Sequence, residues 1–258
     1  MKLHFEPKLD FQLAAVEAVC DLFRGQEICR TEFTVTNQAA GGQLGLGFAE
    51  SGLGIGNRLT LLDDEIHENL NEIQLRNGLA PSTDLDSPDF TVEMETGTGK
   101  TYVYLRTIFE LNKRFGFTKF VIVVPSVAIK EGVYKTLQIT EDHFRSLYAG
   151  VPFSSGSYFL YDSSKPGLVR NFATSPHIQI MVTTVGAINK KDVNNLYKES
   201  EKVGGEKPID LIRATAPVQV LTSKYFDTLQ SIGAKGNMIV VVPEGGNDTI
   251  LNLPTPRG

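Results

Sequence analysis

A candidate phosphate-binding loop runs through Thr96-Gly97-Thr98-Gly99-Lys100-Thr101. The oxygens of a triphosphate must be held without bulky side chains between them, so the glycines would let backbone N–H groups point at the phosphates. The Lys100 ammonium would reach the β- and γ-phosphates, and the Thr101 hydroxyl would ligate magnesium at the start of a helix. These residues predict a site for a nucleoside triphosphate with Mg²⁺.

The segments on both sides of this loop have the expected character. Residues 90–94 form a candidate strand, and residues 100–115 form a candidate helix with an apolar stripe. The loop departs from the usual pattern at Met94, which stands where a small residue is expected. A chance glycine turn is the alternative, but the preceding strand and following helix favour a phosphate site.

The apolar runs that follow predict a sheet. Residues 120–124 are continuously apolar, as in strands that are covered on both faces. Further candidate strands lie at residues 31–35, 178–182, 218–221 and 238–242. Because strands and helices alternate from residue 90 onward, the predicted fold class is α/β, with three layers and a mainly parallel sheet.

Helices are also expected over residues 10–24, from Thr60 to about residue 77, and from Ser126 to about Leu137. Asp10 is available to cap the first of these, and Gly25 would stop it. Thr60 with Asp63 resembles a capping box. Between the first two helices, seven glycines crowd residues 41–56. This segment has too much glycine for a regular strand, so we expect a loop within an insertion rather than a second phosphate cradle.

The composition is that of a globular protein. The 258 residues carry a net charge of −5, which argues against a surface coated for indiscriminate DNA binding but allows a local groove. No apolar stretch approaches the ~20 residues of a membrane span, and the first residues lack a secretory leader, so we expect a cytoplasmic protein. Cys20 and Cys29 have no partner histidines at metal-ligand spacing and are interpreted as reduced packing residues.

Residues 91–106 resemble motif I of superfamily 2 helicases, specifically that of the restriction (Res) subunit of type III restriction-modification enzymes. Methionine also occupies the position of Met94 in that family. Residues 2–13, 121–132 and 178–190 are similar to the start of the family, to its motif Ia and to the segment before its motif II. The resemblance covers approximately residues 1–215 and implies a RecA-like fold, ATP and Mg²⁺ as ligands, and ATP-driven movement on duplex DNA together with a modification (methyltransferase) subunit.

The resemblance also implies roles for particular residues. Gln12 would recognise adenine through its amide, which offers a donor and an acceptor; a solvated glutamine early in a helix is the alternative. Pro125, Ser126 and Lys130 would line a DNA groove, although Ser126 could simply cap a helix. Further DNA-contact candidates by family position are Thr183, Thr184 and Lys190, with a buried strand end as the alternative for the threonines.

The acidic pair of a P-loop motor is missing from the expected place. It should follow the strand after residues 209–215, but residues 216–225 hold no such pair. The acidic runs at 63–65 and 141–142 lack a preceding strand. Glu244 follows an apolar run, but its Pro-Glu-Gly-Gly setting is typical of a turn. The catalytic carboxylates are therefore not identified, and we expect ATP hydrolysis to be weak or absent.

These observations divide the chain into an adenine-contacting helix region (1–30), an insertion (31–88), a partial RecA-like lobe (89–215) and a divergent tail (216–258). Residues 225–244 in the tail are faintly similar to the terminal helix and strand of stomatin-like domains. We expect the sheet to be incomplete and the chain to be a truncated motor part, without its second lobe and nuclease domain. The alternative is a non-enzymatic remnant that binds DNA or a partner.

Overall fold

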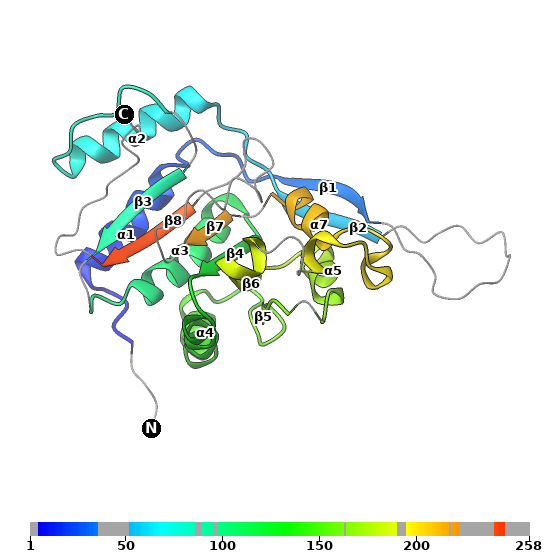
Figure 1. The fold of residues 1–258 in the computed structure, drawn as a ribbon. Helices are drawn as coiled ribbons and strands as arrows, with labels where there is room; N and C mark the ends of the chain where they lie inside the picture. Colours follow the sequence, from blue (N-terminus) through cyan, green and yellow to red (C-terminus); the bar gives the residue numbers. More distant parts are fainter. Residues whose placement is uncertain are drawn as a thin grey trace, which may run out of the picture.

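The computed structural model describes residues 5–35, 52–85, 89–94, 97–162, 164–189, 195–216, 218–221 and 240–245. A six-stranded sheet in the order β3-β8-β7-β4-β6-β5 forms the centre of the molecule (Figure 1). Its strands are β3 (Asp89–Met94), β4 (Lys119–Val124), β5 (Tyr158–Leu160), β6 (Gln179–Thr184), β7 (Val218–Leu221) and β8 (Val240–Gly245). Every neighbouring pair is parallel, which confirms the predicted parallel α/β sheet.

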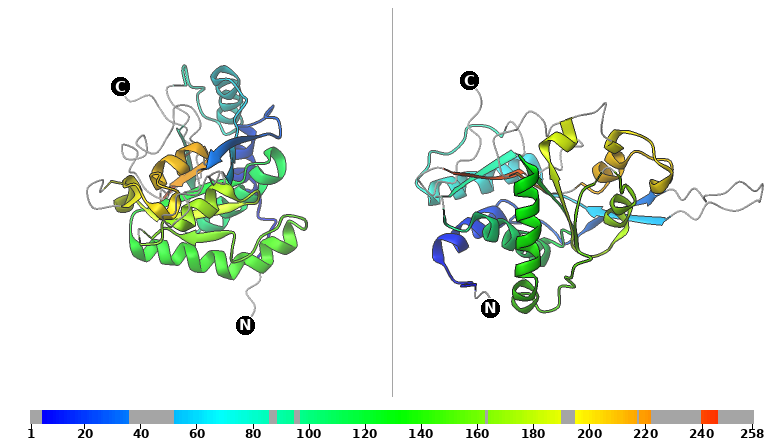
Figure 2. Two further views of the ribbon diagram at one scale, coloured as in Figure 1. Left: turned by 90° about the vertical axis from the view of Figure 1, so that its right-hand side faces the viewer. Right: turned by 60° about the horizontal axis from the view of Figure 1, so that its bottom comes forward.

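Helices surround this sheet. They are α1 (Asp10–Asp21), α2 (Asp63–Arg76), α3 (Lys100–Phe115), α4 (Val127–Leu147), α5 (Gly167–Thr174), α6 (Val185–Asn189) and α7 (Pro208–Ala214), with 3-10 turns η1 (Asn195–Tyr197) and η2 (Glu201–Val203). Figure 2 shows the long helix α4 lying alongside the sheet. In the part of the chain that the structure describes, no helix is both long and apolar enough to cross a bilayer.

The buried strand β4 shows how the layers form. Phe120, Ile122 and Val124 pack with residues of α1 to α4, whereas Val121 and Val123 pack with residues of α5 to α7. Alternate side chains of a strand point to opposite faces of the sheet, so each helical group covers one face. This arrangement confirms the expected three layers. Cys20 is buried in the first of these cores, where burial raises its thiol pKa to about 12, and Cys29 is also a free thiol.

The prediction of a loop throughout the glycine-rich segment is wrong for its last part. β2 (Gly52–Asn57) pairs antiparallel with β1 (Arg30–Val35), and the hairpin lies beside α5 and α7 (Figures 1 and 2). The glycines leave room for neighbours, because a Cβ on Gly54 would overlap the Phe33 ring across the ladder. Glycine is acceptable in a strand where a ring or another backbone approaches so closely. Residues 41–51 lie outside the described part of the chain.

Several helix boundaries also differ from the prediction. α1 ends at Asp21 rather than near residue 24, and Asp10 makes no side-chain cap. α2 begins at Asp63, because its capping carboxylate is Glu65, whose Oε2 accepts from the Leu62 N–H at 2.8 Å. α4 continues ten residues past Leu137, since buried Thr140 and Phe144 extend its apolar face. Boundaries depend on such tertiary contacts, which hydrophobic spacing alone does not reveal.

Candidate nucleotide-binding site

The loop after β3 has the geometry that a phosphate site requires. Gly97 and Gly99 have φ of 85° and 82°, a left-handed conformation that glycine adopts without a Cβ penalty. α3 begins at Lys100, with the Gly99 carbonyl accepting the Val103 N–H at 3.1 Å. The predicted strand, loop and helix are therefore present, although Thr96 lies outside the described residues. Met94 packs its side chain in the core at the end of β3.

The first turn of α3 carries the two side chains assigned to phosphate and magnesium. Lys100 and Thr101 are both half-buried there, and the first turn contains no acidic residue. The unpaired N–H groups and the positive end of the helix dipole favour an anion at this position. The residues present thus fit a triphosphate with Mg²⁺.

Gln12 lies against this loop from α1. Its Nε2 donates to the Thr98 carbonyl at 2.8 Å, and its buried Oε1 has no partner among the described residues. The structure therefore places Gln12 against the loop, with one N–H of its amide engaged by the protein. The adenine contact that the resemblance implies for Gln12 stays a prediction. The alternative of a solvated glutamine is excluded, because only 6% of the residue is exposed.

The carboxyl ends of β4 and β5 lie at the same edge of the parallel sheet as the nucleotide loop. Ser126 caps α4, accepting the Ile129 N–H at 3.3 Å, which confirms the cap interpretation; Pro125 is half-buried beside it. Half-buried Lys130 lies near Asp162, the second residue after β5, which the sequence analysis did not single out. The Ser164 backbone N–H and hydroxyl, with weaker help from Lys165 and Lys130, lower the pKa of Asp162. The three-residue strand β5 gave too short a pattern to be detected.

The candidates at the end of β6 are less accessible. Thr184 accepts the Ala187 N–H at 3.2 Å through Oγ1, so its side chain caps the start of α6, and Lys190 lies outside the described residues.

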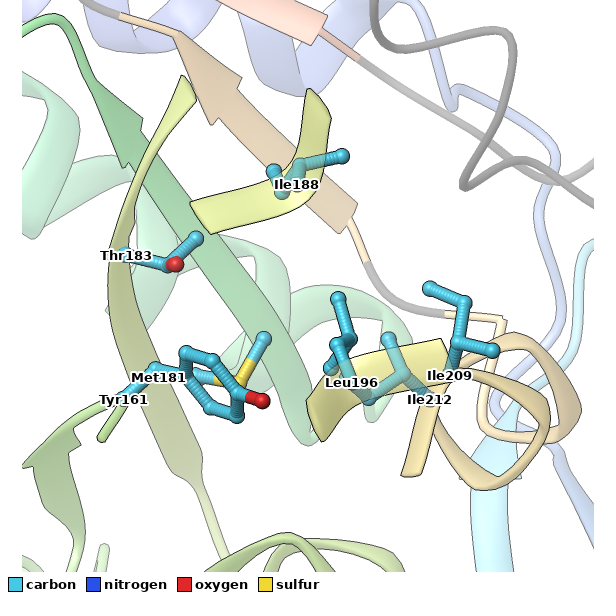
Figure 3. A pocket seen from close by; sticks show the side chains of 7 residues that line it. All are labelled: Tyr161, Met181, Thr183, Ile188, Leu196, Ile209 and Ile212. Atoms are coloured by element: carbon cyan, nitrogen blue, oxygen red, sulfur yellow. The ribbon is translucent and has the colours of Figure 1, made fainter. Parts of the chain in front are cut away.

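Thr183 is buried and lines a small apolar cavity with Met181 and Ile188 (Figure 3). At about 10 Å³ this cavity is at the lower limit of the roughly 10–15 Å³ that one water needs. It lies on the face of the sheet opposite α3, so it is not the nucleotide site.

The acidic runs noted in the sequence are used elsewhere. Glu141 accepts from the Tyr158 hydroxyl at 2.8 Å and pairs with Arg145, which also pairs with Asp142 at 3.5 Å. Glu65 caps α2. Among the described residues, no group of three or more His, Cys, Asp or Glu side chains is placed to hold a metal.

The backbone of the tail reaches the nucleotide end of the sheet. β8 lies directly beside β3, with Glu244 in register with Glu93, and β7 lies between β8 and β4. The side chains of β8 are outside the described part, so the role of Glu244 is not assigned. Thr222 and Ser223 follow β7 in the sequence and are also outside it.

A glycine-rich loop between a parallel strand and a helix, at the carboxyl edge of a three-layer sheet, defines a P-loop nucleotide-binding fold of the RecA-like class. Comparison with known proteins gives the family: residues 61–212 match the sequence profile of the type III restriction enzyme res subunit, and the chain belongs to this family.

Three relatives support this assignment. The chain is 31% identical over 185 residues to the Res subunit of the type III restriction-modification enzyme EcoP15I from Escherichia coli, covering 65% of this chain and 19% of that protein. It is 30% identical over 209 residues to the EcoPI Res subunit of Escherichia phage P1, covering 75% and 20%. It is 28% identical over 170 residues to the StyLTI Res subunit of Salmonella typhimurium, covering 57% and 17%. The chain thus spans about a fifth of the length of these relatives.

Proposed function

We propose that this chain is the ATP- and Mg²⁺-binding part of a helicase-like, DNA-translocating subunit of a type III restriction endonuclease. The observation that carries the proposal is the loop of Gly97 to Lys100, which joins a parallel strand to the N-terminus of a 16-residue helix. Membership in the res-subunit family supports ATP as the nucleotide and a role in restriction-modification, hence a cytoplasmic location.

The nucleotide loop would act on the phosphates directly. The N–H groups around Gly97 and Gly99 and the Lys100 ammonium would bind phosphate oxygens. The Thr101 hydroxyl would ligate Mg²⁺, which neutralises phosphate charge when bound. Because these groups lie on one loop and one helical turn, we expect nucleotide binding to survive without a second motor lobe.

Hydrolysis would be weak. Attack by water needs a positioned carboxylate, which motors of this class place after the strand that here is β7. The sequence continues there with Thr222 and Ser223. The chain would bind ATP while turning it over slowly, if at all.

The DNA path and the protein partner follow from the family and the sheet edge. Pro125, Ser126 and Lys130 follow β4 in the sequence, Thr184 is the last residue of β6, and Lys190 comes six residues later. Backbone N–H groups, hydroxyls and lysines are suitable contacts for DNA phosphates. The relatives are named as Res subunits of restriction-modification enzymes. We therefore propose duplex DNA and a modification subunit as partners.

Equilibrium binding of Mg-ATP and filter binding of duplex DNA, with and without Mg-ATP, test this proposal together. If the chain is the nucleotide-binding part of a DNA translocase, it should bind Mg-ATP, and bound Mg-ATP should change the affinity of the chain for DNA. A chain that binds duplex DNA but no Mg-ATP would instead be a non-enzymatic binding module.

A further inference from the structure

The phenol of Tyr104, in the second turn of α3, is a buried polar group without a partner. Only 3% of the residue is exposed, and its ring packs in the main core. Its hydroxyl is enclosed and makes no hydrogen bond with any described residue. Leaving a buried hydroxyl unsatisfied is costly, so polar groups in a core are nearly always paired. The exception at Tyr104 points to a contact that a bound ligand completes.

Thr101 stands one helical turn before Tyr104. Residues three apart lie on the same face of a helix, and long helical side chains lean back over the turn that precedes them. The phenol hydroxyl is therefore carried toward the Thr101 side chain. Burial raises the pKa of Tyr104, and the nearby Thr101 side chain offsets part of this rise. The two hydroxyls are thus neighbours in the first turns of α3, without a hydrogen bond between them in this structure.

Tyr104 differs in this respect from other tyrosines that pack on α3. The Tyr102 hydroxyl is hydrogen-bonded to Nε2 of His143 at 2.9 Å. The Tyr148 hydroxyl donates to Glu110 at 2.7 Å. The Tyr104 ring is held by a close-packed core, so its hydroxyl has a fixed place beside Thr101. A hydroxyl with a fixed place and a free acceptor can orient a neighbouring hydroxyl.

We infer that Tyr104 is a positioning residue for the proposed magnesium ligand, and that its phenol oxygen accepts the hydrogen of the Thr101 hydroxyl. A hydroxyl ligates a cation through the lone pairs of its oxygen. Directing the hydrogen of Thr101 to Tyr104 leaves those lone pairs for Mg²⁺. The inference rests on the proposed binding of ATP with Mg²⁺, and it gives the buried phenol the partner that it lacks.

Tyr104→Phe tests the inference, because it removes the hydroxyl and keeps the ring. The affinity for Mg-ATP, measured by isothermal titration, should fall by a factor of about 3 to 10. The affinity for ATP in excess EDTA should not change. Without ligand, the variant should unfold at the same temperature as the wild type or higher, because no buried hydroxyl is left unpaired. A purely structural role for the hydroxyl would lower the unfolding temperature instead.

Tyr148→Phe is the matched control. It also removes one tyrosine hydroxyl from the main core, but this hydroxyl is bonded to Glu110 near the middle of α3. The control should unfold at a lower temperature, because it loses a hydrogen bond. Its affinities for ATP with and without Mg²⁺ should equal those of the wild type.

A double-mutant cycle with Thr101→Ala separates the inference from the proposed function. In the Thr101→Ala background, Tyr104→Phe should cause no further loss of Mg-ATP affinity, because the hydroxyl that it would orient is gone. An equal loss in both backgrounds, no loss in either, or a lower unfolding temperature for Tyr104→Phe would overturn the inference and leave the proposed function intact. A wild type that does not bind Mg-ATP would overturn the proposed function itself.

Discussion

Gly56 of β2 lies against the backbone of Thr215, the residue that follows α7. A Cβ at position 56 would lie 2.8 Å from the Thr215 Cα and carbonyl oxygen, and the neighbouring Asn57 N–H donates to that oxygen at 2.9 Å. These contacts hold the β1–β2 hairpin against the residue that immediately precedes Ala216 and β7. The close approach explains why a strand here contains glycine at this position.

Gly56→Ala should destabilise the fold by about 1–3 kcal/mol, because the added methyl group must displace backbone rather than a mobile side chain. Urea or thermal unfolding measures the effect. Gly132→Ala is the control, since Gly132 lies in α4 with open space at its Cβ position. Alanine is favoured over glycine there by up to about 1 kcal/mol, so the control should be slightly stabilised. A Gly56→Ala variant as stable as the wild type would contradict the tight contact with Thr215.

Ala216→Gly should stabilise the protein. Ala216 has φ of 43°, and it is the one residue other than glycine with a positive φ in the described ranges. A left-handed conformation costs an L-residue about 1–2 kcal/mol, of which the greater flexibility of unfolded glycine cancels part. We expect a net gain of up to about 1 kcal/mol in unfolding free energy. Ala214→Gly, inside α7, should destabilise; a loss of stability in both variants would refute strain at Ala216.

Lys119→Met should stabilise the protein most at neutral and lower pH. Lys119 is fully buried at the start of β4, with Nζ donating to the Ser175 carbonyl and lying 5.8 Å from the centre of the Phe172 ring. Burial lowers its pKa from 10.5 to about 7. Between these values the unfolded chain binds a proton that the folded chain does not, so wild-type stability rises with pH in this window.

The advantage of Lys119→Met, at least about 1 kcal/mol near pH 7, should therefore shrink as the pH rises toward 10. Unfolding free energies at several pH values measure it. Lys113→Met, at an exposed position in the last turn of α3, should show no such trend. A pH-independent difference for Lys119→Met would mean that this lysine is not neutralised on folding.

Thr101→Ala should reduce the dependence of ATP affinity on Mg²⁺, because the hydroxyl proposed to ligate the metal is removed. Thr101→Ser keeps a hydroxyl and should retain most of that dependence. Titration of ATP with and without Mg²⁺ compares the two variants. Equal Mg²⁺ dependence in Thr101→Ala and the wild type would assign the metal contact to another group.

The sequence predicted the elements whose pattern is local. The continuous apolar run of residues 120–124 predicted β4, and the glycine spacing before Lys100 predicted the loop and the start of α3. β2 could not be predicted, because Gly54 and Gly56 make room for the Phe33 ring and the Thr215 backbone, and these neighbours are distant in sequence. Likewise the amide of Gln12 indicated a place near the nucleotide, but only the folded chain shows that its nitrogen binds Thr98.

Mg-ATP binding by Lys100→Ala, measured by isothermal titration, tests the nucleotide-binding assignment most directly. Removing the ammonium from the first turn of α3 should abolish measurable binding, whereas Lys113→Ala at the far end of the same helix should bind as the wild type does. Wild-type affinity in Lys100→Ala would contradict the phosphate site and the motor function built on it.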